Sequence, residues 1–173
     1  MSDKGLQEYI DHADKLKADK DFEEAIIYYN RASSIEPDNC QILEKIADCY
    51  FCLNIFDKTI EYYKKCLEKD SNYISAIIGL AKTFDVTGKY HEAIDYIKKA
   101  LATDPENIEY LSLLAVYYTE ISNYEKSLDV INYLVKKNPE SDKTYFLLGL
   151  NNEKSGNTKL AFQNYHKSIE INP

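Results

Sequence analysis

The sequence predicts an all-α protein built as a solenoid of helix pairs. The first indication is a gapless repeat of 34 residues, which marks a repeat architecture. The second is that all four prolines fall on this period, because steps of 34 residues connect Pro37, Ser71, Pro105, Pro139 and Pro173. The third is the scarcity of glycine (5) and proline (4), which favours helices over a turn-rich sheet. The five repeats span residues 6–39, 40–73, 74–107, 108–141 and 142–173.

The first half of each repeat is expected to form a helix that packs closely against its neighbours. One column of the repeat holds only small residues, which let two helices approach each other. An apolar residue usually precedes the small one, and a large residue usually follows three positions later, as on the face of a helix. The small residues are Ala13, Ala47, Ala81, Ala115 and Gly149.

The second half of each repeat starts after a break in the helical pattern. A helix that ends in the left-handed conformation favours glycine or asparagine at its end. A second apolar stripe then runs to a proline or serine near the end of the repeat, which stops the helix. Each repeat is therefore predicted to be two antiparallel helices joined by short turns. The breaks fall at Lys20, Asn54, Gly88, Ser122 and Gly156.

These columns of small, aromatic and proline residues resemble the tetratricopeptide repeat family over residues 6–173. The resemblance implies a right-handed superhelical α-solenoid of antiparallel helix pairs, whose first helices line a concave groove. It also implies a broad role in protein–protein interaction. The chain departs from the pattern at His12 and Asn152, which occupy normally apolar columns in the terminal repeats, where less burial is expected.

Residues 1–173 are expected to form a single repeat array and to be the N-terminal part of a longer protein. Arrays of this family normally end in a capping helix, whereas the fifth helix pair ends at Pro173. Without such a cap, Phe162, Tyr165 and Ile169 would lie on an uncovered helix face. Self-association through this C-terminal repeat is therefore a hypothesis.

The charge and the N-terminal stretch exclude several classes of partner. The formal net charge of −8 argues against nucleic acid, because such binding depends on clustered lysine and arginine. The N-terminal stretch is charged throughout and lacks the apolar run of a signal peptide or anchor, so no membrane insertion is expected. Cysteines without an evident pairing pattern indicate a reducing, cytoplasmic location.

All four cysteines fall in the second repeat, at Cys40, Cys49, Cys52 and Cys66. Cys49 and Cys52 have the C-x2-C spacing used in zinc sites, and a disulfide is a second alternative. The spacing falls in the middle of a predicted helix, however, and Cys49 and Cys66 occupy packing columns. Small buried side chains are therefore the favoured interpretation. Cys52 is expected to face the groove and to be the most reactive thiol.

No pattern in the chain predicts catalysis. The three histidines lie in three different repeats. Neither the phosphate-binding pattern G-x-x-x-x-G-K-S/T nor the dinucleotide-binding pattern G-x-G-x-x-G is present. The carboxylates are abundant but fall on predicted solvent faces, which does not suit acid–base chemistry. We therefore expect a protein that is not an enzyme and that needs no cofactor or metal.

The groove-facing positions of the first helices are not required for packing and are the candidate binding residues. They are acidic in the first two repeats and apolar in the last two. This gradient suggests a partner peptide or helix with Lys or Arg at one end and large apolar residues at the other. In the alternative interpretation, the apolar positions only pack a curved surface and the acidic ones are solvated. The candidates are Ile10, Asp14, Glu44, Asp48, Phe51, Ile78, Lys82, Val116, Phe146 and Leu150.

The groove does not match the carboxylate clamp with which family members hold chaperone tails. Where the asparagines of that clamp would lie, this chain has Asp14 and Lys45, and Asp48 lies nearby. Fixed negative charges repel a terminal carboxylate. A chaperone-tail adaptor is therefore not expected.

The leading functional hypothesis is a non-catalytic scaffold or adaptor that binds a partner segment in the concave groove. Two alternatives stay open. One is a structural solenoid that assembles end to end, and the other is the interaction region of a larger enzyme or multi-subunit complex. A fold of this kind does not by itself decide between them.

Overall fold

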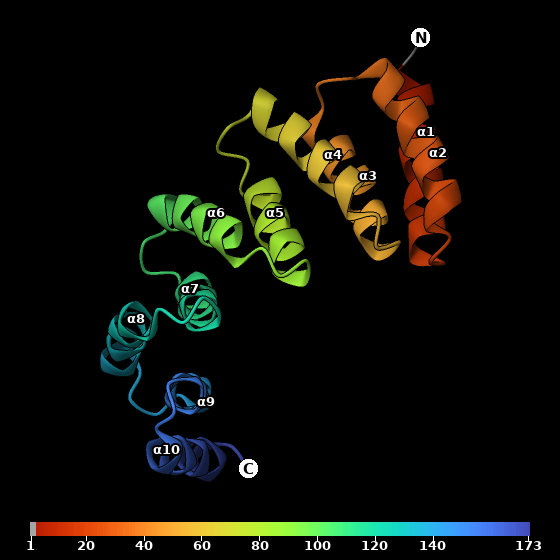
Figure 1. The fold of residues 1–173 in the computed structure, drawn as a ribbon. Coiled ribbons are helices and arrows are strands. Elements are labelled where there is room, and N and C mark those ends of the chain that lie inside the picture. Colours follow the sequence, from red (N-terminus) through yellow and green to blue (C-terminus); the bar gives the residue numbers. More distant parts are fainter. Residues whose placement is uncertain (1–2) are drawn as a thin grey trace. The chain divides into compact units, whose positions relative to one another are not determined.

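The computed structural model of the protein describes residues 3–173, and within this range it contains only α-helices and the turns that connect them (Figure 1). The all-α prediction is confirmed. Met1 and Ser2 of the predicted array lie outside the described residues. The chain forms two compact units, which we call unit 1 (up to Thr87) and unit 2 (Gly88–Pro173). None of the described helices is long and apolar enough to span a membrane.

Unit 1 consists of two helical hairpins and one further helix. Helices α1 and α2 pack together, as do α3 and α4, and the two hairpins lie side by side (Figure 1). Helix α2 also contacts α3, and α5 contacts both α3 and α4. The helices are α1 (Asp3–Ala18), α2 (Phe22–Ile35), α3 (Cys40–Cys52), α4 (Phe56–Lys69) and α5 (Ile74–Val86).

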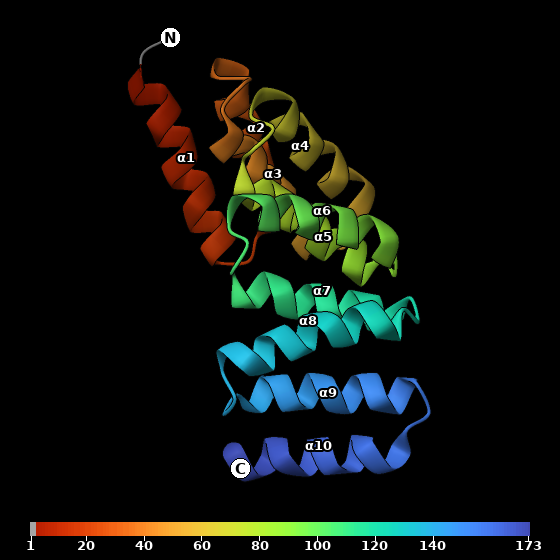
Figure 2. The same cartoon turned by 90° about the vertical axis from the view of Figure 1, so that its left-hand side faces the viewer.

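Unit 2 consists of one helix followed by two hairpins. Each helix packs against the next one in the chain, and α7 also contacts α9. Figure 2 shows α7 to α10 as successive layers that run in alternating directions. The helices are α6 (Tyr90–Thr103), α7 (Ile108–Glu120), α8 (Tyr124–Lys137), α9 (Asp142–Lys154) and α10 (Thr158–Ile171).

The turn inside each repeat has the left-handed backbone that the sequence predicts. Gly88 and Gly156 have φ of 70° and 85°, and Asn54 has φ of 58°. Lys20 (φ 65°) and Ser122 (φ 58°) adopt the same conformation although they are neither glycine nor asparagine. After Lys20, the Asp21 N–H donates to the Leu16 carbonyl at 2.9 Å, which closes the end of α1.

Among the described residues, three of the four first helices α3, α5, α7 and α9 begin at a capping side chain. The side chains of Asn39, Asn107 and Ser141 accept hydrogen bonds from backbone N–H groups in the first turns of α3, α7 and α9. Tyr73 precedes α5 and gives no such cap. Its hydroxyl instead donates to Glu44 on α3 at 2.6 Å, so this position serves a contact between helices.

The core of each unit is built on the predicted packing columns. Ala13, Ala47, Ala81 and Ala115 are fully buried, which confirms that helices approach each other at the small column. Around them, larger buried residues fill the space between helices, including Ile46 and Tyr29 in unit 1. In unit 2 the corresponding cluster contains Ala115, Ile131, Leu134 and Leu147.

Candidate functional site

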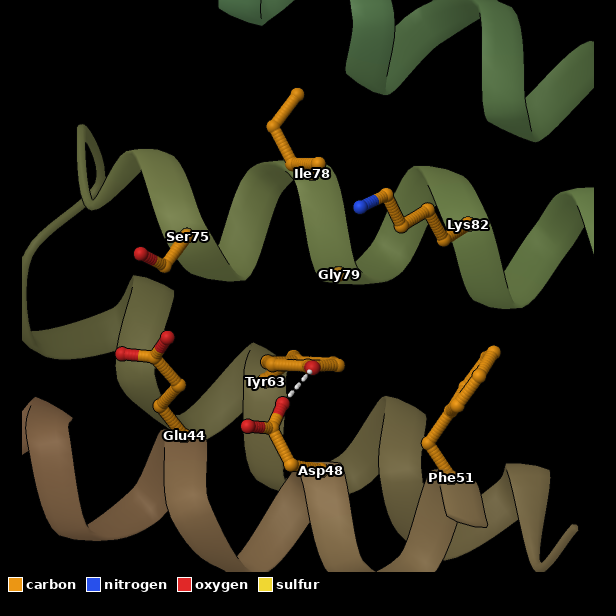
Figure 3. A pocket seen from close by; sticks show the side chains of 8 residues that line it. All are labelled: Glu44, Asp48, Phe51, Tyr63, Ser75, Ile78, Gly79 and Lys82. Atoms are coloured by element: carbon orange, nitrogen blue, oxygen red, sulfur yellow. Dashed lines mark hydrogen bonds between the residues drawn. The ribbon is translucent and has the colours of Figure 1, made fainter.

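Half of the predicted groove residues line one pocket of unit 1. The pocket lies between α3 and α5 and has a volume of about 320 Å³ (Figure 3). Its wall on α3 carries Glu44, Asp48 and Phe51, and its wall on α5 carries Ile78 and Lys82. We call it the α3–α5 pocket. Three further residues that the sequence does not single out complete it: Tyr63, Ser75 and Gly79.

Tyr63 and Gly79 form the base of the α3–α5 pocket. The Tyr63 side chain is buried, and its hydroxyl donates to Asp48 Oδ1 at 2.6 Å. A Cβ atom at position 79 would overlap the Tyr63 ring, so glycine is what lets the ring lie against α5. Burial raises the pKa of Tyr63 well above its ordinary value, and the Asp48 carboxylate adds to the rise. The phenol therefore stays protonated and remains a donor.

Two charges in the pocket have no ionic partner among the described residues. Glu44 accepts the Tyr73 hydroxyl but forms no ion pair in that range, and Lys82 forms none either. Asp48, by contrast, pairs through Oδ2 with Lys17 Nζ of α1 at 2.8 Å. In Figure 3, Glu44 lies at one end of the pocket, while the Lys82 side chain reaches in from α5.

The first hairpin contains the same arrangement one repeat earlier, with one difference. Asp14 and Tyr29 occupy the positions of Asp48 and Tyr63, and the Tyr29 hydroxyl donates to Asp14 Oδ1 at 2.5 Å. Where the second repeat interface has Gly79, the first has Lys45. Lys45 bonds both carboxylate oxygens of Asp14, with 2.7 Å to Oδ2, and its Nζ lies 5.7 Å from the centre of the Tyr29 ring.

The Lys45 ammonium keeps Asp14 ionised. Burial acts to raise the pKa of Asp14, but the hydrogen bonds from Lys45 and Tyr29 and the charges of Lys45 and Lys17 outweigh it. The pKa of Asp14 is therefore below its ordinary value. A second depression of about 750 Å³ runs along α1 and α3. Asp14 and Asp48 line it together with Lys45 and Lys17, the lysines with which they form ion pairs.

The sequence predicts Asp14 and Asp48 to be free acidic groups of the groove, but both are paired with lysines. The sequence gives no direct view of side chains from neighbouring repeats, and the pairing lysines were not predicted. The spacing in the sequence does offer a signal for this pairing. Two residues of adjacent repeats that lie about one helical turn apart in the repeat pattern are separated by 31 residues instead of 34. Ion pairs at this separation join Lys17 to Asp48, Lys45 to Asp14, Lys69 to Asp38 and Lys137 to Glu106.

The remaining predicted residue of unit 1, Ile10, is half-buried on α1. It packs against the core cluster that contains Ala13 and Tyr29. Packing therefore explains its apolar character.

The predicted apolar residues of unit 2 do not share one site. Val116 packs on the cluster around Ile131, as the packing interpretation holds. Phe146 is 53% exposed, and its ring lies 5.5 Å from that of Tyr165. Phe146 lines a pocket of about 340 Å³ together with Leu147 and polar residues of α7, α9 and α10. Leu150 is half-buried on α9 and is not part of that pocket's lining.

The described residues offer no evident place for a metal ion. Between residues 3 and 173, no group of three or more His, Cys, Asp or Glu side chains is arranged to hold one. All four cysteines are free thiols: Cys49 and Cys66 are buried, Cys40 is half-buried and Cys52 is exposed.

Sequence models of known families match most of the chain. Models described as tetratricopeptide repeat match residues 55–117 and, separately, residues 8–39 and 142–173. No curated protein sequence matches this chain.

Solved structures with the same fold include two structures of MamA. MamA 41-end from Desulfovibrio magneticus RS-1 is 20% identical, with a TM-score of 0.88 over 99% of this chain and 96% of that chain. Another MamA crystal structure is 22% identical, with a TM-score of 0.84 over 98% and 93% of the two chains. YrrB, described as a TPR protein with an unusual peptide-binding site, is 15% identical, with a TM-score of 0.78 over 95% and 85%. At these identities the likeness shows the fold.

Proposed function

Because the chain belongs to the tetratricopeptide repeat family, whose members are generally non-catalytic interaction scaffolds, we propose that it holds a segment of a partner protein. We further propose that the α3–α5 pocket receives a lysine or arginine side chain of that segment. The description of YrrB as a peptide-binding member supports a peptide as the kind of ligand. The observation that carries the proposal is the exchange of Lys45 for Gly79 between two otherwise equivalent positions.

The first hairpin serves as an internal template for the ligand. The Lys45 ammonium, which reaches this hairpin from α3, gains an ion pair with a carboxylate and a contact with a tyrosine ring. The α3–α5 pocket keeps the carboxylate and the tyrosine but has glycine in place of the lysine. An ammonium or guanidinium group supplied by a partner would therefore meet a carboxylate and a tyrosine here too, although Asp48 already bonds Lys17 through its other oxygen.

The rest of the α3–α5 pocket indicates what flanks the basic side chain. Glu44 offers a carboxylate with no ionic partner in the described part of the chain, so it favours a cation. Phe51 and Ile78 provide apolar surface for a neighbouring side chain of the partner. Lys82 needs an acceptor, which a carboxylate or backbone carbonyl of the same segment would supply.

A peptide selection tests this proposal. Random peptides displayed on phage are selected on the full chain, and we expect enrichment of peptides that place a basic residue next to an apolar one. In a synthetic peptide of this kind, replacement of the basic residue by norleucine keeps the length of the side chain and removes its charge. We expect affinity to fall about tenfold, measured by calorimetry.

Matched variants locate the binding site. Glu44→Gln removes the unpaired carboxylate of the pocket and should also weaken binding about tenfold. Asp14→Asn is the control, because Asp14 is paired with Lys45 and does not line the α3–α5 pocket. Equal losses for both variants, or enriched peptides without a basic residue, would contradict the proposal.

Self-association remains a second candidate, because α10 exposes three large apolar side chains: Leu160, Phe162 and Ile169. Phe162 is 69% exposed and Ile169 is 64% exposed, whereas Ile26 and Ile94, in the same repeat column as Phe162, are buried. Ile169→Asp should leave a concentration-dependent oligomer monomeric in light scattering. A chain that is monomeric before the substitution contradicts this candidate.

A further inference from the structure

Two cysteines of the second hairpin lie against each other. Cys40 is the first residue of α3, and Cys66 lies in the last turn of α4. The Cys40 thiol donates to the Cys66 carbonyl at 3.3 Å, and the Cys66 thiol reaches the Cys40 carbonyl at 3.9 Å. Each sulfur therefore points at the backbone of the other residue, although the two lie 26 residues apart in the chain.

Packing explains one of these thiols but not the pair. The column of Cys66 holds Ala32 and Ala100 in other repeats, both fully buried, so a small side chain is enough there. In the fifth repeat, Ser168 of this column donates to the Asp142 carbonyl at 2.9 Å, just as Cys66 does to Cys40. The column of Cys40, however, contains no other small thiol or hydroxyl. Its other members are Leu6, Ile74, Ile108 and Asp142.

We propose that Cys40 and Cys66 form a reversible intramolecular disulfide in the presence of a low-molecular-weight disulfide such as oxidised glutathione. The pair would then be a redox modification site that fastens the first turn of α3 to the last turn of α4. The thiols are free in the structure, which is their expected state in the reducing compartment proposed for this chain.

The chemistry proceeds by two exchanges. The Cys40 thiolate attacks one sulfur of oxidised glutathione, and the first glutathione leaves as a thiolate. The Cys66 thiolate then attacks the Cys40 sulfur of the mixed disulfide and expels the second glutathione. The protein loses two protons and two electrons, and one oxidised glutathione becomes two reduced molecules. A reducing thiol reverses both steps.

Exposure sets the order of the two steps. Cys40 is half-buried and is open to the reagent, whereas Cys66 is fully buried. Burial and the contact with the Cys40 thiol raise the pKa of Cys66, so little of it is ionised before the reagent arrives. Cys66 therefore acts as the resolving thiol, and its step is the slower one.

The disulfide would tether α3, which forms one wall of the α3–α5 pocket, to α4, which supplies Tyr63 to its base. Glu44 lies one helical turn after Cys40 on α3, and Tyr63 lies one turn before Cys66 on α4. The redox site does not depend on the proposed ligand of that pocket, and its test needs no ligand.

Oxidation of the full chain tests the proposal. Cys52→Ser removes the exposed thiol, which would otherwise form its own mixed disulfide. The folded variant is treated with oxidised glutathione, remaining thiols are alkylated, and tryptic peptides are identified by mass spectrometry. We expect one cross-linked peptide pair that contains Cys40 and Cys66, lighter by two hydrogens and released by reductant. The melting midpoint should rise by about 5–10 °C because the link restrains the unfolded chain.

Cys66→Ala in the same background is the control, because alanine already fills this column in the first and third repeats. This variant should stop at a mixed disulfide of Cys40 with glutathione and show no rise in midpoint. The proposal is overturned if the parent also stops at that mixed disulfide, if it does not react, or if the cross-link involves Cys49.

Discussion

Several side chains of unit 1 bind their protons more tightly in the folded protein than in the unfolded chain. Burial raises the pKa of Cys49 to about 11 from an ordinary value of 9.0. Burial also raises the pKa of Tyr29 and of Tyr63, each of which donates to an aspartate. Burial acts to lower the pKa of Lys17, but its hydrogen bond to Asp48 outweighs this and raises it. All four groups lie close to Asp14 or Asp48.

These shifts predict a loss of stability in alkaline solution. A group whose folded pKa is raised contributes stability that is complete below its unfolded pKa and is lost as the pH rises through the folded value. For Cys49 this window runs from 9.0 to about 11. We expect urea denaturation to show a falling free energy of unfolding across this window, with about 2 kcal/mol of the loss due to Cys49.

Cys49→Ala separates this contribution from the others. Its free energy of unfolding should fall less across the same window, because the tyrosines and Lys17 still titrate but the thiol is absent. If the variant and the parent lose equal amounts, the Cys49 thiol does not contribute in this way.

At single positions, sequence reasoning predicts residue type better than it predicts pairing. It identifies Glu44, Asp48 and Lys82 as surface residues of the first helices, and the structure places them in one pocket. It does not identify Tyr63, because an aromatic residue in a packing column looks the same whether its hydroxyl is used or not. The hydroxyl becomes informative only when its distance to Asp48 is known.

Helix ends are the elements that the sequence predicts most closely. All five predicted breaks have a left-handed residue, although two of them are neither glycine nor asparagine. The repeat period locates these ends, because a break that is clear in most repeats indicates where the break falls in the others. The start of α5 is less predictable, because Tyr73 does not cap the helix with its side chain and its hydroxyl donates to Glu44 of α3 instead.

Lys20→Gly should stabilise the end of α1. Lys20 has φ of 65°, which strains a residue with a Cβ atom, whereas glycine adopts this conformation freely. The gain exceeds the larger entropy of glycine in the unfolded chain, and we expect about 0.5–1 kcal/mol in urea denaturation. Lys20→Ala is the control and should give no gain, because it keeps the Cβ atom. A glycine variant no more stable than the alanine variant would show that the turn is not strained.

At the scale of the whole chain, the boundary between the two compact units does not coincide with a boundary between repeats. The period treats the third repeat like the others, yet α5 belongs to unit 1 and α6 to unit 2. Repeat arrays are held together by interfaces between neighbouring elements, so stability is roughly a sum of local terms. The period treats every repeat alike, which is why the division at Thr87 could not be predicted from it.

Local stability predicts that damage to one unit leaves the other protected. Ile131 is buried in the core of unit 2, and Ile131→Ala should cost about 3 kcal/mol. Hydrogen exchange followed by mass spectrometry should show faster exchange in α7, α8 and α9, while α1 to α3 keep their protection. Asn132→Ala, at an exposed neighbour on the same helix, is the control. A uniform increase along the chain would instead indicate one cooperative unit.

The exchange of lysine for glycine between positions 45 and 79 has a consequence for how such arrays diversify. We call an interface between two repeats saturated where a lysine of the array itself pairs with the aspartate, as Lys45 does, and receptive where glycine leaves that position to the cation of a partner, as we propose at Gly79. Exchange of lysine and glycine at this one position of the repeat would then place a receptive interface elsewhere in an array, without a change in the residues that make the helices stack. Specificity for a partner would then lie in the order of saturated and receptive interfaces along the array.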